Sequence, residues 1–181
     1  MRARRDPEGR KRAIVEAAAD LIAESGIVGL THRKIAARAQ VPLGSTTHYF
    51  ASLDDLKVEA LEHIANVLDD GLQVVAHELA ESSDWQRTLA QVFYGYLSDP
   101  ARVRSDVAFY VVGTGNPALR PLASRWFDGL VSVLADYVEL EIARAIAVYG
   151  DGAMVHTLVH GSPPSEDAIA DVIGRLLGSS P

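Results

Sequence analysis

Apolar residues recur along this chain at the three- and four-residue intervals of an α-helix. In the first such stretch Ile14, Leu21 and Ile22 share one face, which predicts a helix over residues 7–25 that ends at Gly26. No segment alternates apolar and polar residues in the two-residue period of a β-strand. The pattern therefore predicts an all-α fold of about nine helices.

A long helix is predicted to begin near Ser52, because a serine followed three residues later by Asp55 resembles a capping box. Its apolar face continues at helical spacing from Leu56 to Leu72. Stretches rich in glycine, serine and proline then separate shorter helices. These are predicted over residues 85–97, 101–112, 118–137, 139–160 and 166–177.

Residues 31–50 predict two short helices joined by a tight turn. The first covers residues 31–39, and the second begins at Pro42, which suits a first helical position because proline has no N–H to leave unbonded. The turn between them, at Gln40 and Val41, is so short that the two helices must meet at a sharp angle. This is the geometry of a helix-turn-helix, which places its second helix in the major groove of DNA.

The surface of that second helix favours the same interpretation. Small, hydroxyl-bearing and aromatic side chains follow one another from Gly44 to Tyr49. Hydroxyl, imidazole and phenol groups suit phosphate oxygens and base edges, and Gly44 would let the backbone approach the sugar–phosphate wall. The alternative is a polar surface helix that binds nothing.

Charge is divided unevenly along the chain. The net charge of −7 argues at first against a nucleic-acid partner, but residues 1–50 carry nine Lys or Arg against five Asp or Glu, whereas residues 51–181 carry eight against nineteen. A basic head on an acidic body is expected where only the head meets phosphate. The basic charge is predicted to form an arm ahead of the first helix, although a disordered solubilising tail is an alternative. The arm contains Arg2, Arg4, Arg5, Arg10, Lys11 and Arg12.

Composition excludes several other classes of protein. The chain has no cysteine, so disulfides, thiolate zinc sites and cysteine nucleophiles are excluded. It shows no Ser/His/Asp arrangement, phosphate-cradling glycine loop or HExxH motif, so we expect neither an enzyme nor a cofactor. His156 and His160 have a spacing that can bind metal, but without a nearby acidic ligand we expect a partly buried or interface pair instead. Without a long apolar segment, no membrane span is expected and the cytoplasm is the predicted location.

Residues 8–57 resemble the DNA-binding domain of the TetR family of transcriptional regulators. The resemblance implies a helix-turn-helix domain over residues 1–51, called the head below, and a helical ligand-binding and dimerisation domain over residues 52–181, called the body. It also implies a homodimer that binds a palindromic operator, usually represses, and releases DNA when a small apolar or amphipathic effector enters the body. The matching residues are Leu21 to Gly26, Leu30-Thr31, Ile35-Ala36, Ala39, Val41, Gly44, Tyr49-Phe50, Ser52 and Leu56.

The resemblance also implies roles for single residues. Thr31 would cap the second helix and contact phosphate, and Tyr49 would bond a phosphate. This chain departs from the family at Leu43 and Leu53, where a lysine is frequent, and at Pro42, where serine is usual. Each missing lysine removes a phosphate contact, which Lys57 and the arm could replace. The predicted DNA-binding residues are Thr31, Arg33, Gly44, Ser45, Thr46, Thr47, His48, Tyr49 and Lys57, with Ile35, Val41 and Phe50 in the core.

Two further sets of residues follow from the resemblance. Aromatic residues at helical spacing are usually plain core, but the family implies a cavity in the body, lined by His63, Asn66, Phe93, Phe109 and Trp126. The last two helices would form the dimer interface, through Ala145, Tyr149, Ala153, Met154, Thr157 and His160. A helical protein-interaction module whose helix-turn-helix no longer binds DNA specifically is the remaining alternative.

Overall fold

The computed structural model describes residues 6–178, and all of its regular elements are helices. The prediction of an all-α fold is confirmed, and these residues form ten helices in place of about nine, because one predicted helix is divided into α7 and α8. In chain order they are α1 (Pro7–Ser25), α2 (His32–Arg38), α3 (Leu43–Tyr49), α4 (Leu53–Ala80), α5 (Trp85–Leu97), α6 (Pro100–Gly115), α7 (Arg120–Ala123), α8 (Arg125–Leu134), α9 (Leu140–His160) and α10 (Glu166–Leu176).

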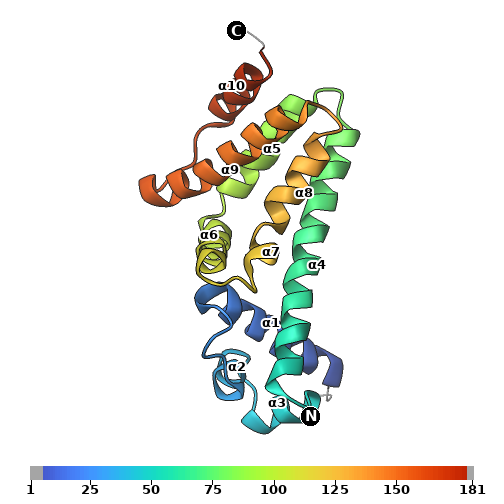
Figure 1. Ribbon diagram of the computed structural model, residues 1–181, viewed down its shortest axis with the longest axis vertical. Coiled ribbons are helices and arrows are strands. Elements are labelled where there is room, and N and C mark those ends of the chain that lie inside the picture. Colours follow the sequence, from blue (N-terminus) through green and yellow to red (C-terminus); the bar gives the residue numbers. More distant parts are fainter. Residues whose placement is uncertain (1–5, 179–181) are drawn as a thin grey trace, which may run out of the picture.

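The three helices of the head lie at one end of an elongated molecule, and α10 lies at the other (Figure 1). Local signals set their ends. Gly26 follows α1 with a positive φ of 79°, a backbone conformation that glycine adopts without steric cost. The Thr31 hydroxyl accepts a hydrogen bond from the Lys34 N–H and so caps α2, as predicted. Helix α3 begins at Leu43, one residue later than predicted. Pro42 is its N-cap and not its first helical residue, because the Pro42 ψ of 142° is extended.

One hydrophobic cluster, which we call the head core, fills the space between α1, α2 and the start of α4. Ile14, Ile22, Ile35 and Leu56 are fully buried in it. Phe50 is also buried and Val41 half-buried, so the predicted core positions are confirmed. The Ser52 hydroxyl accepts a hydrogen bond from the Asp55 N–H at 3.1 Å, as the capping signal predicts.

The body is built around α4, which runs along most of the molecule (Figure 1). Its first turns contribute Leu56 to the head core, and its later turns contribute Leu72 and Leu79 to a second cluster, the body core, shared with α5, α6, α8, α9 and α10. Within residues 6–178 no helix is both long and apolar enough to cross a membrane.

The helix predicted over residues 118–137 is wrong in one respect, since it is divided at Ser124 into α7 and α8. Its two ends pack on different cores, which explains the division. Leu119 is fully buried in the head core, whereas Leu130 and Leu134 belong to the body core.

The head core also extends beyond the head. Phe109 of α6 is buried in it, and a Cβ on Gly26 would lie 3.2 Å from Cγ1 of Val112 in α6. The head is therefore closed by side chains of the body, and a domain boundary at residue 51 stays a prediction.

Candidate nucleic-acid interface and ligand cavity

Helix α3 has one exposed face and one inward face. Leu43, Gly44, Thr47 and His48 are exposed, in the i, i+4 relation that places side chains on one face of a helix. No heavy atom lies within 4 Å of a Cβ built on Gly44, so the surface there is open to a partner.

The inward face corrects one predicted contact. Thr46 is fully buried, and its hydroxyl donates a hydrogen bond to the carbonyl of Leu43 at 2.8 Å. It shares a face with buried Phe50, four residues later, so its side chain is part of the packing and the prediction that it contacts DNA is wrong. Ser45 and Tyr49 are half-buried, and the Tyr49 ring packs edge-on against His48 with centroids 5.1 Å apart.

Arg33 and Lys57, two cations predicted to contact DNA, differ in whether they are already paired with a carboxylate. Arg33 is exposed, with no ion pair in residues 6–178. Lys57 donates to the Asp54 carboxylate at 2.8 Å, and this hydrogen bond holds the pKa of Asp54 below its ordinary value. Asp54 therefore offsets part of the positive charge with which Lys57 would meet a phosphate. Thr31, also predicted to touch phosphate, is exposed as the cap of α2, two residues before Arg33.

The basic arm is partly a helix. Arg2, Arg4 and Arg5 lie outside the described residues. The other three cations lie inside α1 rather than ahead of it, because Pro7 starts the helix with Asp6 as its cap. Lys11 pairs with Glu59 of α4 at 2.8 Å, so part of its charge joins α1 to α4. The other two are Arg10 and Arg12.

Arg38 joins α2 to α1 through an exposed ion pair. Its two terminal nitrogens donate to both carboxylate oxygens of Glu24, at 2.9 and 2.6 Å. These bonds hold the pKa of Glu24 below its ordinary value and raise that of Arg38. Such a paired contact supports the orientation in which α2 holds α3.

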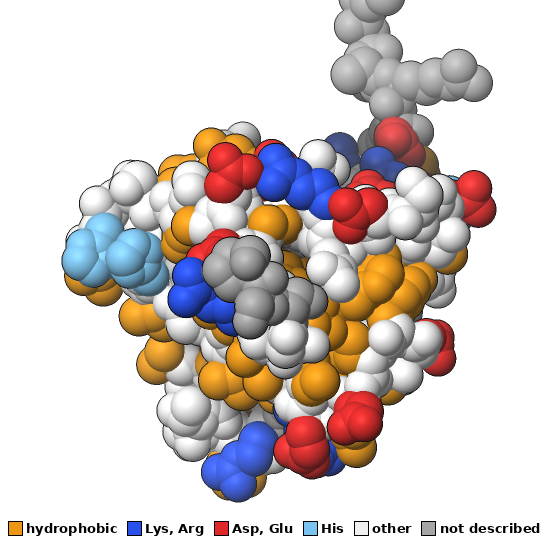
Figure 2. Space-filling view, turned by 90° about the horizontal axis from the view of Figure 1, so that it is seen from above, with side chains coloured by type: hydrophobic (Ala, Val, Ile, Leu, Met, Phe, Trp, Pro, Cys, Tyr) orange, Lys and Arg blue, Asp and Glu red, His pale blue; other side chains and the backbone are white. Residues whose placement is uncertain are grey.

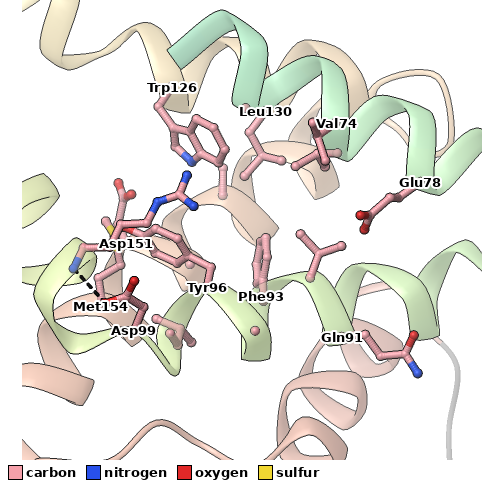
Figure 3. Close-up of a pocket in the computed structure, with 18 of the residues that line it drawn as sticks. Val74, Glu78, Gln91, Phe93, Tyr96, Asp99, Trp126, Leu130, Asp151 and Met154 are labelled. Carbon is pink, nitrogen blue, oxygen red and sulfur yellow. Dashed lines mark hydrogen bonds between the residues drawn. The ribbon is translucent and has the colours of Figure 1, made fainter. Parts of the chain in front are cut away.

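The body encloses a cavity of about 570 Å³ between α4, α5, α6, α8 and α9. Trp126 and Leu130 enter it from one side, and Tyr96 and Phe93 from the other (Figure 3). A smaller hollow of about 90 Å³ adjoins it and shares part of its lining, including Tyr96 and Trp126.

Three of the five predicted ligand-contacting residues line this space. Phe93 and Trp126 line the cavity, and Phe109 lines the smaller hollow. His63 and Asn66 line neither, so their prediction is wrong. They lie on the part of α4 nearer the head, whereas the α4 residues that face the two spaces begin only at position 67.

Polar groups that the sequence analysis missed meet inside the aromatic walls. The Tyr96 hydroxyl donates to the Asp106 carboxylate at 2.7 Å, and the Tyr110 hydroxyl donates to Asp151 at 3.0 Å. Burial raises the pKa of both aspartates, because a charged carboxylate is costly in a site with little water. The Arg102 guanidinium lies over the Tyr96 ring, 5.2 Å from its centroid.

Neither aspartate forms a direct ion pair, although the charge of Arg102 acts against burial and partly offsets the rise in the pKa of Asp106. Within residues 6–178, no Lys, Arg or His nitrogen forms an ion pair within 4.0 Å of Asp106 or Asp151. One signal could have identified Asp151, since it is the only charged residue between positions 145 and 160 of an otherwise apolar helix.

Three of the six residues predicted for a dimer interface lie on the face of α9 that packs within the chain, and the interface itself stays a prediction. Ala153, Met154 and Thr157 are buried within a single chain, and Met154 lines the cavity. Ala145 and Tyr149 are half-buried. Because α9 is apolar on most sides, its sequence pattern does not distinguish the face toward the core from the face toward a partner.

The opposite face of α9 carries exposed apolar side chains, Val148, Val155 and Val159. His160 is exposed there too, with its ring stacked on that of His156 at 4.2 Å. Seen from the α10 end, histidine and hydrophobic side chains lie side by side at the edge where α9 ends (Figure 2). In the described part of the chain no three potential metal ligands come together.

The chain matches two family models. Residues 14–60 match the model described as bacterial regulatory proteins of the tetR family, and residues 80–179 match the tetracyclin repressor-like C-terminal domain. The HTH-type transcriptional regulator BetI of Burkholderia thailandensis is 26% identical over 169 residues, which cover 86% of this chain and 85% of BetI.

Two solved structures are similar over nearly the whole chain. The multidrug binding protein EbrR in complex with ethidium is 37% identical, with 95% of this chain and 99% of EbrR covered and a TM-score of 0.69. A TetR-family member from Streptomyces coelicolor A3 is 34% identical, with 92% and 97% covered and a TM-score of 0.73.

Proposed function

The chain belongs to the TetR family of bacterial transcriptional regulators, and we propose that it is a dimeric repressor released from a palindromic operator by an aromatic organic cation. The observation that carries the effector class is a pair of half-buried aspartates without ion-pair partners: Asp151 lines both the aromatic cavity and the smaller hollow, and Asp106 lines the hollow. The sequence analysis predicts an apolar or amphipathic effector. An uncharged effector of that kind would leave both carboxylates without an ion-pair partner.

The cavity matches such a ligand in size, shape and charge. Its volume lies within the range of about 300–1,000 Å³ that holds drug-sized molecules. The faces of Trp126, Tyr96 and Phe93 offer stacking surfaces for flat rings, and aromatic faces attract cations. Carboxylates outnumber the lone guanidinium among the lining residues, since Glu78 and Asp99 join the two aspartates against Arg102.

Similar proteins support this ligand class. EbrR has been solved in complex with ethidium, proflavin and malachite green. All three are aromatic cations, and the cavity described above would offer each of them aromatic rings to pack against and carboxylates to neutralise the charge.

Helix α6 is suited to pass the signal to the head. Its first turns bring Arg102 and Asp106 to the cavity, and its later turns place Phe109 in the head core and Val112 beside Gly26. A ligand that displaces α6 would therefore move α1 and change the separation of the two α3 helices. Two half-sites on DNA demand a fixed spacing of about 34–36 Å, so a small change of separation weakens binding.

The second copy would pack on the exposed face of α9. Val148, Val155 and Val159 follow one another at helical spacing and are apolar although exposed. Their burial against the same face of a partner would form a two-fold symmetric contact.

The test of the regulator begins with genomic fragments captured by the purified protein at near-physiological salt and read by sequencing. We expect one palindromic site to be enriched, and malachite green to release the protein from it. Malachite green suits the release assay better than ethidium or proflavin, which bind DNA themselves. No enrichment by a folded dimer would overturn operator binding and favour the interaction-module alternative.

The test of the effector class needs no DNA. Binding of malachite green to the protein is followed by quenching of tryptophan fluorescence and by calorimetry, with its uncharged leuco form as the matched ligand. We expect saturable binding of the cation and much weaker binding of the leuco form. Equal affinities would contradict the cationic effector while leaving operator binding intact.

A further inference from the structure

The exposed face of α3 presents an apolar side chain at its first residue. Leu43 is 52% exposed, and it is absent from both the buried and the partly buried members of the head core. It stands on the same face as Thr47, four residues later, and beside Gly44, where the surface is open. A single exposed leucine is ordinary elsewhere on a protein, but the first residues of a DNA-reading helix are those that reach base edges.

The rest of α3 limits what the helix can recognise. Its sequence, LGSTTHY, contains no Arg or Lys to bond guanine, no Asn or Gln to bond adenine in two places, and no Asp or Glu to accept from cytosine. With Thr46 buried, its exposed face has only Leu43, Gly44, Thr47 and His48 to offer. Of the specific base contacts in the major groove, the one that a leucine can make is an apolar contact with the C5 methyl group of thymine.

We propose that Leu43 reads the C5 methyl group of a thymine in each half of the operator, which makes it a specificity-determining residue. The inference rests on the proposed operator binding.

Replacement of thymine by deoxyuridine tests the inference, because it removes only the methyl group. Each thymine of the enriched operator is replaced in turn, in both half-sites, and the dissociation constant of the full-length protein is measured. Removal of one buried methyl group is worth about a fourfold loss of affinity per half-site. We expect one thymine position to show this loss with the unaltered protein, and Leu43→Ala to abolish the difference between thymine and deoxyuridine there.

Two further variants separate the contact from a general effect. Leu43→Met keeps an apolar side chain and should keep the dependence on the methyl group. Val28→Ala shortens an exposed apolar side chain outside α3 and should leave every deoxyuridine effect unchanged. A deoxyuridine effect that persists at full size in Leu43→Ala, or none at any position, overturns the inference while operator binding stands. If the unaltered protein enriches no site, the proposed function and the inference both fail.

Discussion

The head core is closed by aliphatic and small side chains, whereas the body core surrounds a cavity with aromatic walls and half-buried carboxylates. Three successive alanines of α1, Ala17 to Ala19, are buried in the head core, where small side chains allow helices to approach closely. In the body, Asp106 and Asp151 are buried at a cost, since carboxylates in such a place favour their neutral form. This difference in packing indicates that the closely packed head holds α3 in one orientation, whereas the body is less closely packed and has room for a ligand.

The two cores meet at α6, which contributes to both. Phe109 is buried in the head core and also lines the smaller hollow beside the cavity. Substitutions in the closed head core should therefore mainly lower stability, whereas substitutions around the cavity should mainly alter ligand binding.

The largest effect should follow from a cavity cut into the head core. Leu56 is fully buried, so Leu56→Ala should lower the free energy of unfolding by about 2–5 kcal/mol, measured by chemical denaturation. Leu130→Ala should cost less, because Leu130 already faces the cavity. Val58→Ala, at a position 55% exposed, should change stability by less than about 0.5 kcal/mol. A greater loss for Leu130→Ala than for Leu56→Ala would break the comparison.

A charge on the exposed face of α9 should disrupt the dimer. Val155→Asp would place two carboxylates opposite each other across a two-fold axis, which should weaken association by about 2–5 kcal/mol. Light scattering after size-exclusion chromatography at several concentrations measures the effect. Val111→Asp alters an equally exposed valine on α6 and should remain dimeric. Dimers of unchanged strength in Val155→Asp would move the interface to another surface.

Ligand binding in the cavity should weaken when one carboxylate is lost. Asp151→Asn should weaken binding of malachite green about tenfold, roughly 1.4 kcal/mol, because the ligand's charge loses its partner. Asp70→Asn removes an exposed carboxylate of α4 outside the cavity and should leave binding unchanged. Fluorescence titration of the three proteins measures the difference, and equal affinities would exclude Asp151 as the cation's partner.

The same carboxyl group predicts a dependence on pH. Burial raises the pKa of Asp151, so in the folded protein it takes up a proton at a higher pH than a surface aspartate does. Cation affinity should fall as the pH is lowered through that raised pKa, and Asp151→Asn should lack this step. Conversely, the free energy of unfolding should decrease as the pH rises from the unfolded pKa through the folded one, because only the folded state resists ionisation.

The smallest effect concerns the outer face of the head. Leu43→Lys would place a cation on the exposed face of α3, so the slope of log K against log salt should become steeper by about 0.9 for each phosphate that the new side chain reaches. Titrations on the enriched operator and on random DNA at several salt concentrations measure the slope. Val111→Lys adds the same charge far along the chain from α3, on α6, and should leave the slope unchanged. An unaltered slope in Leu43→Lys would indicate that position 43 faces bases alone.

The head was predictable because its signals are local. Gly26 ends α1, Thr31 caps α2 and Ser52 caps α4 through bonds to residues within four positions, so the local sequence sets where these helices begin and end. Thr46 escaped this reasoning because a threonine in a polar run looks like its neighbours until helix α3 is packed on the head.

The body was predictable only in outline. The sequence predicts His63 as a cavity residue, one to two turns before the α4 residues that line the two spaces, and it predicts Met154 at a dimer interface although Met154 lines the cavity. Apolar periodicity shows that a helix is buried, but several faces of α4 and α9 are apolar at once. Which face meets which neighbour depends on contacts between residues far apart in the chain.

By itself the sequence determined the helical class, the helix-turn-helix and its caps, since periodicity, glycine conformation and side-chain capping act over a few residues. Tertiary structure alone decided that Thr46 is buried, that Leu43 is presented on the open face of α3, and that Asp106 and Asp151 both line the smaller hollow beside the cavity. The physical reason is that a residue's burial and its partners are properties of packed helices, and helices α4, α6 and α9 come together only when the chain is folded.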